Sequence, residues 1–119
     1  MLVLIAHGSR DARWRTSVES IVAAVGAEVG PDSVALAYMD CTPPTLADIV
    51  KPAAARGVAR FRVLPLFLAA EGHVERDVQP LVDALRAERG LIDITLLPPI
   101  GQHPLFVNLL RQILAQEPD

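Results

Sequence analysis

The stretch LVLIAHGSR (residues 2–10) begins with five consecutive apolar residues and ends in a histidine, a glycine, a serine and an arginine. A short, continuous apolar run is typical of a strand covered on both faces, as in a parallel sheet. His7 is then the first residue after that strand. An imidazole at the end of a buried strand is a candidate ligand-binding group.

The rest of the chain alternates between strand and helix patterns. Three further apolar runs occur, and each run is followed by apolar residues at the three-to-four-residue spacing of a helix. The predicted strands are residues 2–6, 33–39, 60–66 and 91–97, and the predicted helices are residues 11–29, 46–56, 80–89 and 105–114. Four βα units predict an α/β fold with a four-stranded parallel sheet, flavodoxin-like strand order 2-1-3-4 and helices on both faces. At 119 residues, we expect one domain, residues 1–119.

Composition excludes several classes of protein. Hydrophobic residues make up 51% of the chain but aromatic residues only 4%, so the core is aliphatic. The net charge of −3 and the pI of about 5.5 argue against nucleic-acid binding, which needs a basic face. The single Cys41 excludes an internal disulfide and a thiolate metal cluster, which fits the reducing cytoplasm. The first apolar run is too short to span a membrane.

The predicted strand order brings chemistry-bearing residues to one sheet edge. In open parallel sheets, ligands bind at the carboxyl ends of the strands, where the winding direction reverses. That point lies between the first and third strands. His7 directly follows the first strand, and His73 lies in the loop that follows the third strand. Asp40 follows the second strand at the same edge. The alternative interpretations are histidines bonded to loop backbone and an aspartate that forms a turn or caps a helix.

Four stretches resemble a known family: LIAHGSRD, AYMDCTPPTLADIV, VLPLFLAAEGHVERDVQPLVDAL and PPIGQHPLFVNLLRQIL. In this order, and over nearly the whole chain, they are similar to the CbiX/SirB group of class II chelatases. The resemblance implies insertion of a divalent metal into sirohydrochlorin or a related precorrin. It also implies a chelatase-like fold of two α/β halves facing across a cleft. This chain is similar to the short form, which supplies one half, so a symmetric homodimer is implied.

The resemblance also assigns roles to particular residues. His7 and His73 match the metal-binding and catalytic histidines of the family. Asp40 stands where many relatives have a glutamate, so its carboxylate is one methylene shorter. Glu71 stands where relatives often have a glycine, and it would either add an acidic metal contact or restrict the loop.

The substrate implied by the resemblance carries eight carboxylates, so a net-acidic protein needs a local basic rim. Arg10, Arg13 and Arg76 flank the two histidines, and the guanidinium fork matches carboxylate geometry. The alternative interpretation is that each of these arginines belongs to a solvated helix face. Ser9 would bond a substrate carboxylate or, as we favour, cap the first helix. We expect a structural role for His103, and the apolar stripe of the last helix to be core or part of a dimer seam.

Metal insertion needs an ion that is held loosely enough to leave the protein. Neutral imidazole suits Co²⁺, Ni²⁺ and Fe²⁺, and its pKa near 6.5 lets it also accept a proton. Co²⁺ is our first choice, and no cofactor is expected beyond this substrate metal.

Other functions remain as alternatives. A carrier that binds metal or tetrapyrrole without turnover would use the same ligands. A histidine phosphatase is disfavoured because Ala6 stands where those enzymes have an arginine. A nucleotide- or flavin-binding module is disfavoured because HGSRDAR lacks a glycine-rich phosphate loop.

Overall fold

A computed structural model describes residues 1–8, 10–40, 42–69, 72, 74–88 and 90–116. Strands and helices alternate along the chain, as the apolar patterns predict. The elements are β1 (Leu2–Ala6), α1 (Ala12–Val29), β2 (Val34–Tyr38), α2 (Leu46–Ala55), β3 (Arg60–Pro65), α3 (Gln79–Glu88), β4 (Asp93–Leu96) and α4 (Pro104–Ala115). A π-helical turn, Val74–Val78, leads into α3, and a 3-10 turn, Ile100–Gln102, leads into α4.

The four strands form one parallel sheet in the order β2-β1-β3-β4, which confirms the predicted fold class. β1 is central, and its Leu2 lies in register with Val34 on one side and Arg62 on the other. β3 ends at Pro65, because proline has no N–H to continue the ladder. All four carboxyl ends therefore meet at one edge, with the reversal of winding between β1 and β3.

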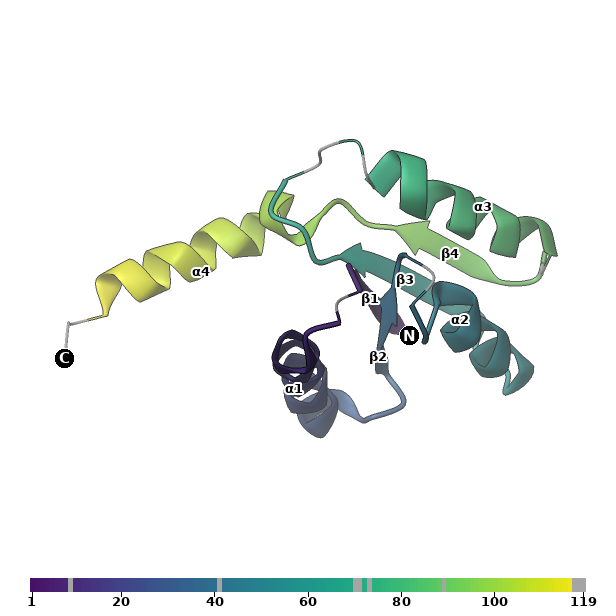
Figure 1. The fold of residues 1–119 in the computed structure, drawn as a ribbon, viewed down its shortest axis with the longest axis horizontal. Coiled ribbons are helices and arrows are strands. Elements are labelled where there is room, and N and C mark those ends of the chain that lie inside the picture. Colours follow the sequence, from purple (N-terminus) through teal and green to yellow (C-terminus); the bar gives the residue numbers. More distant parts are fainter. Residues whose placement is uncertain (9, 41, 70–71, 73, 89, 117–119) are drawn as a thin grey trace.

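Helices cover the two faces of the sheet unequally (Figure 1). α2 and α3 pack on one face over a large aliphatic core that includes Val3, Ile5, Val50, Phe61, Val63, Val82 and Ile94. α1 packs on the other face over a smaller cluster that includes Leu4, Ala6, Leu36 and Tyr38. Apart from Phe61 and Tyr38, the members named here are aliphatic, as the composition predicts. The core fixes the strand edge that carries the candidate site.

Two helix starts follow from local hydrogen bonds. The Asp11 carboxylate accepts a bond from the backbone N–H of Arg13 at 2.9 Å, so Asp11 is the N-cap of α1. The cap predicted for Ser9 is therefore wrong, because an N-cap must lie directly before the first helical residue. Thr45 caps α2 in a reciprocal pair of bonds with Asp48 at 3.2 and 2.9 Å.

α4 departs from the compact arrangement. It projects away from the sheet (Figure 1), and none of its residues is buried. The prediction that its apolar stripe is core is wrong, and the alternative of a dimer seam stays a prediction. In the part of the chain that the structure describes, no helix has the length and apolarity needed to cross a membrane.

Candidate functional site

His7 lies directly after β1, at the strand edge where the winding direction reverses. Its side chain is exposed, and its ring centroid is 4.9 Å from that of Phe67, with the two planes tilted by 53°. Phe67 follows β3, whose end is tied to β1 by a 2.8 Å bond from the N–H of Leu66 to the carbonyl of Ile5. The ends of β1 and β3 thus place an imidazole against an aromatic ring.

Asp40 is held beside the residue that follows His7. The backbone N–H of Gly8 donates to Asp40 Oδ1 at 3.1 Å, and the N–H of Met39 donates to the carbonyl of Ala6 at 3.0 Å. A Cβ on Gly8 would collide with Asp40 Oδ1 and with Thr42 Oγ1. Only glycine permits this close approach, which brings the loop after β2 against the loop after β1.

The environment of Asp40 favours its charged form. Partial burial raises the pKa of this carboxyl, but hydrogen bonds from the Thr42 hydroxyl and from the backbone N–H groups of Asp40, Gly8 and Thr42 lower it, and the net pKa lies below its ordinary value. Asp40 is therefore an anion at neutral pH. It both fixes two loops and places a negative charge at the edge that carries His7.

The loop after β3 is anchored at both ends. At its start, the N–H of Gly101 donates to the carbonyl of Phe67 at 3.1 Å, and a Cβ on Gly101 would collide with the backbone of Leu68. Near its end, Gly72 adopts the left-handed φ of 79° and its carbonyl accepts bonds from the backbone N–H and the Nε of Arg76, at 3.1 and 3.3 Å. These bonds fix two described residues of this loop, Phe67 and Gly72.

The structure places the predicted arginines as follows. Arg10 and Arg13 are exposed near the start of α1, and Arg13 Nε lies 3.6 Å from the carboxylate of Asp11. Arg76 is exposed on the π-helical turn and directs its Nε to its own loop. In sequence, Arg10 and Arg13 follow β1, and Arg76 follows β3. Their role in binding a substrate stays a prediction.

Three predicted site residues, His73, Glu71 and Ser9, lie outside the described residues. Among the residues that are described, no three His, Cys, Asp or Glu side chains form a group that would hold a metal ion. The predicted ligand set of His7, His73, Asp40 and Glu71 therefore stays a prediction. His103 has the expected structural role, since its Nδ1 accepts the N–H of Leu105 at 3.1 Å and so caps α4.

Sequence reasoning missed Phe67 and Gly8 as parts of the site. Phe67 is one of only three phenylalanines and comes directly after a strand, which is a usable signal for an aromatic at a ligand edge. The need for glycine at position 8 has no such signal, because the clash involves side chains 32 and 34 residues away.

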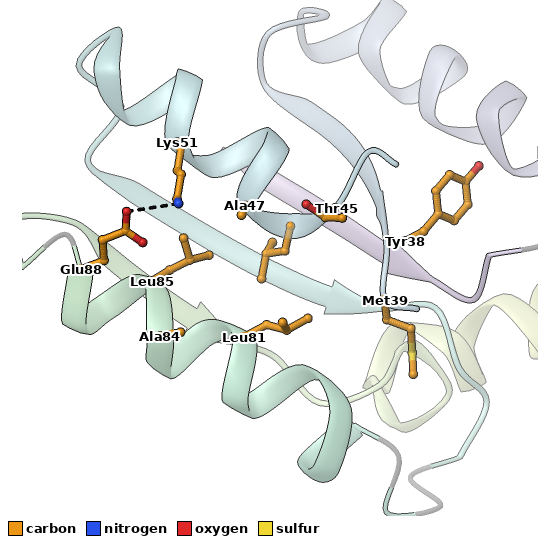
Figure 2. A pocket seen from close by; sticks show the side chains of 10 residues that line it. Tyr38, Met39, Thr45, Ala47, Lys51, Leu81, Ala84, Leu85 and Glu88 are labelled. Carbon is orange, nitrogen blue, oxygen red and sulfur yellow. Dashed lines mark ion pairs between the residues drawn. The ribbon is translucent and has the colours of Figure 1, made fainter. Parts of the chain in front are cut away.

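A separate apolar cavity of about 310 Å³ lies between α2 and α3 (Figure 2). Leu46, Leu81 and Leu85 line it, and an ion pair of 3.1 Å between Lys51 Nζ and Glu88 Oε1 lies at its rim. Its only ionisable groups are already paired or, like Tyr38, belong to the core. It has no donor set for a metal, so the edge with His7 is the better candidate site.

The fold and the site together define a class: a parallel α/β domain with an imidazole and an ionised carboxylate at its switch-point edge, a ligand chemistry that suits a divalent cation. The comparisons agree with this class. The family model CbiX matches residues 1–117, and the chain belongs to this family.

Curated relatives carry chelatase names. The sirohydrochlorin cobaltochelatase of Methanopyrus kandleri is 36% identical over 81 residues, which cover 68% of this chain and 57% of that protein. The sirohydrochlorin cobaltochelatase of Methanococcoides burtonii is 28% identical over 118 residues, which cover 92% of this chain and 89% of that protein. The chain thus spans little more than half the length of the first relative and most of the second.

Solved structures share the fold. A CbiX protein from Marinobacter aquaeolei VT8, assigned to cobalamin (vitamin B12) biosynthesis, is 38% identical with a TM-score of 0.80, over 95% of this chain and 92% of that one. The sirohydrochlorin chelatase SirB from Bacillus subtilis subspecies spizizenii, in complex with cobalt, has a TM-score of 0.77 at 19% identity. This chain covers 48% of that SirB chain, so the fold corresponds to one half of it.

Proposed function

We propose that this protein is a sirohydrochlorin chelatase, a lyase that inserts a divalent metal ion into sirohydrochlorin or a related precorrin. The observation that carries the proposal is the position of His7, at the switch point of a sheet whose sequence matches the CbiX family throughout. The names of the curated relatives support the same activity.

The reaction exchanges a metal ion for two protons. Two pyrrole N–H bonds break, the nitrogens bind the ion, and the two protons leave on bases. His7 and His73 are proposed to hold the ion through neutral imidazole and to accept the protons near neutral pH. Two histidines and one carboxylate, from Asp40 or from the further candidate Glu71, would leave coordination positions open, so the ion can pass to the macrocycle.

Phe67 and the ionised Asp40 support this chemistry from the described edge. The ring of Phe67 packs against the His7 imidazole and limits the positions open to it. The negative charge of Asp40 attracts a cation to the edge that carries His7. Arg10, Arg13, Arg76 and Ser9 are proposed to bind the carboxylates of the substrate.

Cobalt is the metal we propose, for a reaction in cobalamin biosynthesis. The relatives from Methanopyrus kandleri, Methanococcoides burtonii and Methanococcus maripaludis are named cobaltochelatases, whereas a relative from Arabidopsis thaliana is named a chloroplastic ferrochelatase. Fe²⁺ and Ni²⁺ suit the same imidazole and carboxylate ligands, and Fe²⁺ would place the chain in siroheme biosynthesis. We place the reaction in the cytoplasm, in a homodimer whose second copy supplies the opposite wall of the cleft.

An absorbance assay tests the activity. Sirohydrochlorin is mixed anaerobically with Co²⁺, Fe²⁺ or Ni²⁺, with catalytic amounts of protein or with none, and the spectral change is followed. We expect many turnovers per chain, fastest with Co²⁺. A change that stops at one equivalent per site would instead support a carrier, and a rate equal to that of metal alone would contradict the proposal.

A further inference from the structure

The backbone of His7 is held on both sides by the loop that follows β2. Before His7, the carbonyl of Ala6 accepts a bond from the N–H of Met39 at 3.0 Å. After His7, the N–H of Gly8 donates to Asp40 Oδ1 at 3.1 Å. These bonds hold the two rigid peptide planes that flank His7, and so they fix the direction in which its side chain leaves the backbone.

Thr42 supports this arrangement from the same loop. Its hydroxyl and its backbone N–H both donate hydrogen bonds to the carboxylate of Asp40. Its side chain also lies directly against Gly8, because a Cβ on Gly8 would collide with Thr42 Oγ1 and Thr42 Cβ. The loop closes just beyond Thr42, where the carbonyl of Pro44 accepts the N–H of Tyr38 at 2.9 Å. Thr42 is therefore placed to hold the carboxylate that the N–H of Gly8 needs.

The acceptor positions of the Asp40 carboxylate are already in use. An ionised carboxylate offers about four lone-pair sites to donors or cations. Four groups donate to Asp40: the hydroxyl and N–H of Thr42, the N–H of Gly8 and the N–H of Asp40 itself. A metal ion bound to this carboxylate would displace one of them, and the bond that supports Gly8 is among those at stake.

The contact between His7 and Phe67 makes the direction of the His7 side chain important. The two ring centroids are 4.9 Å apart. Phe67 is held independently, since its carbonyl accepts the N–H of Gly101 at 3.1 Å. A rotation of the peptide after His7 would therefore move the imidazole relative to Phe67. A displacement of about 1 Å at a reacting group costs on the order of 10²-fold in rate.

We propose that Thr42 is a positioning residue for His7. It holds the Asp40 carboxylate on the N–H of Gly8, and this clasp, formed by residues 8, 40 and 42, fixes the backbone that carries the imidazole. Asp40 thus contributes its charge and its hydrogen bonds, and it is not a ligand of the substrate ion. The inference rests on the proposed function, because it states how His7 is kept in place for metal insertion.

Thr42→Val tests the clasp, because valine keeps the branched shape that packs against Gly8 and removes only the hydroxyl. We expect kcat for insertion of Co²⁺ into sirohydrochlorin to fall about tenfold, less than for a full 1 Å displacement because the other three donors to Asp40 remain. KM for sirohydrochlorin should not change. Thr42→Ser keeps the hydroxyl and should restore most of kcat. If Asp40 were a ligand, Thr42→Val would free one of its acceptor positions and would not slow the reaction.

Thr16→Val is the matched control for the loss of a threonine hydroxyl. The hydroxyl of Thr16 donates to the carbonyl of Ala12 at 2.8 Å, within α1. This variant should insert metal at the natural rate, and circular dichroism checks the folding of all three variants. A natural kcat in Thr42→Val, a loss that Thr42→Ser does not restore, or an equal loss in Thr16→Val would each overturn the clasp.

Nuclear magnetic resonance measures the position of His7 without metal or tetrapyrrole. The natural chain should show nuclear Overhauser contacts between the ring protons of His7 and Phe67. We expect these contacts to weaken in Thr42→Val, to return in Thr42→Ser and to persist in Thr16→Val. Contacts of natural strength in Thr42→Val would contradict the role of Thr42.

The two proposals fail separately in these experiments. A natural chain that inserts no metal would contradict the function alone, and the ring contacts of the variants would still decide the clasp. An active natural chain whose Thr42→Val variant keeps its rate and its ring contacts would contradict the clasp alone.

Discussion

His7 combines an exposed side chain with a ring contact to Phe67, directly after the end of β1. An imidazole in this position is open to a ligand at the strand edge. We expect His7→Ala to lower the rate of metal insertion by about 10²- to 10⁴-fold, the usual contribution of a positioned acid–base group. His73→Ala should lose activity to a similar extent. Initial rates from the absorbance of sirohydrochlorin, with circular dichroism as a folding check, measure both effects.

His103→Asn is the matched control for these two variants. Asparagine is a favourable N-cap, so it keeps the start of α4 while it removes an imidazole. This variant should insert metal at the natural rate. A natural rate in either His7→Ala or His73→Ala would remove that residue from the site.

The lowered pKa of Asp40 predicts how the stability of the protein depends on pH. Because its pKa in the folded state is lowered, the charged form stabilises the fold at every pH above the unfolded value of about 3.9, and this contribution is lost as the pH falls through the lower folded value. Asp40→Asn should therefore be less stable than the natural chain at pH 7 by less than about 1 kcal/mol, because the side chain is exposed. The difference should shrink below about pH 4.

Urea unfolding at pH 7 and at pH 3.5 measures the contribution of Asp40. Asp32→Asn removes an exposed carboxylate at the opposite edge of the sheet and controls for the change in net charge. An Asp40→Asn variant that is equally destabilised at both pH values would show that the charge of Asp40 has no part in holding the loops.

At this scale the sequence predicted residue positions better than residue contacts. His7 and Asp40 follow strands and were placed at the correct edge. The cap of α1 was predicted at Ser9, but Asp11 provides it, because a helix start can shift by two residues among several good capping side chains. The clash that requires glycine at position 8 depends on the tertiary approach of Asp40 and Thr42.

At the scale of elements, the 3-10 turn before α4 braces the loop that leads to His73. Gly101 lies so close to the backbone of Leu68 that no Cβ fits between them. Gly101→Ala must therefore move one of the two segments, and we expect a loss of about 1–3 kcal/mol of stability, as for other overpacked sites. The rate of metal insertion should fall as well, because the loop moves with Leu68.

Gly90→Ala is the control for that substitution, because a Cβ there meets nothing within 4 Å. Denaturant unfolding and the absorbance assay applied to both variants separate steric strain from the general effect of removing a glycine. Equal midpoints for Gly101→Ala and Gly90→Ala would mean that the turn does not brace the loop.

The strands and their order followed from the sequence because a βα alternation with right-handed crossovers admits few arrangements. The π-helical turn at residues 74–78 was missed, since its residues were assigned to a loop before the proline of α3. For α4 the pattern correctly predicted a helix with an apolar stripe. An apolar stripe shows that a face is to be buried, but it does not show whether its own sheet or another surface will bury it.

At the scale of the whole molecule, a cleft built from two copies has a kinetic consequence. If the cleft needs two copies, the specific activity of the unlinked chain should fall on dilution below the dissociation constant of the dimer. Two copies joined by a Gly/Ser linker of about 20 residues, with a root-mean-square span of about 25 Å, should keep full activity at the same dilutions. The linker holds the second copy at an effective concentration near the millimolar range.

The dilution series is measured by initial rate per chain, alongside light scattering of the same samples. A natural chain that stays fully active where scattering shows only monomer would contradict a two-copy cleft.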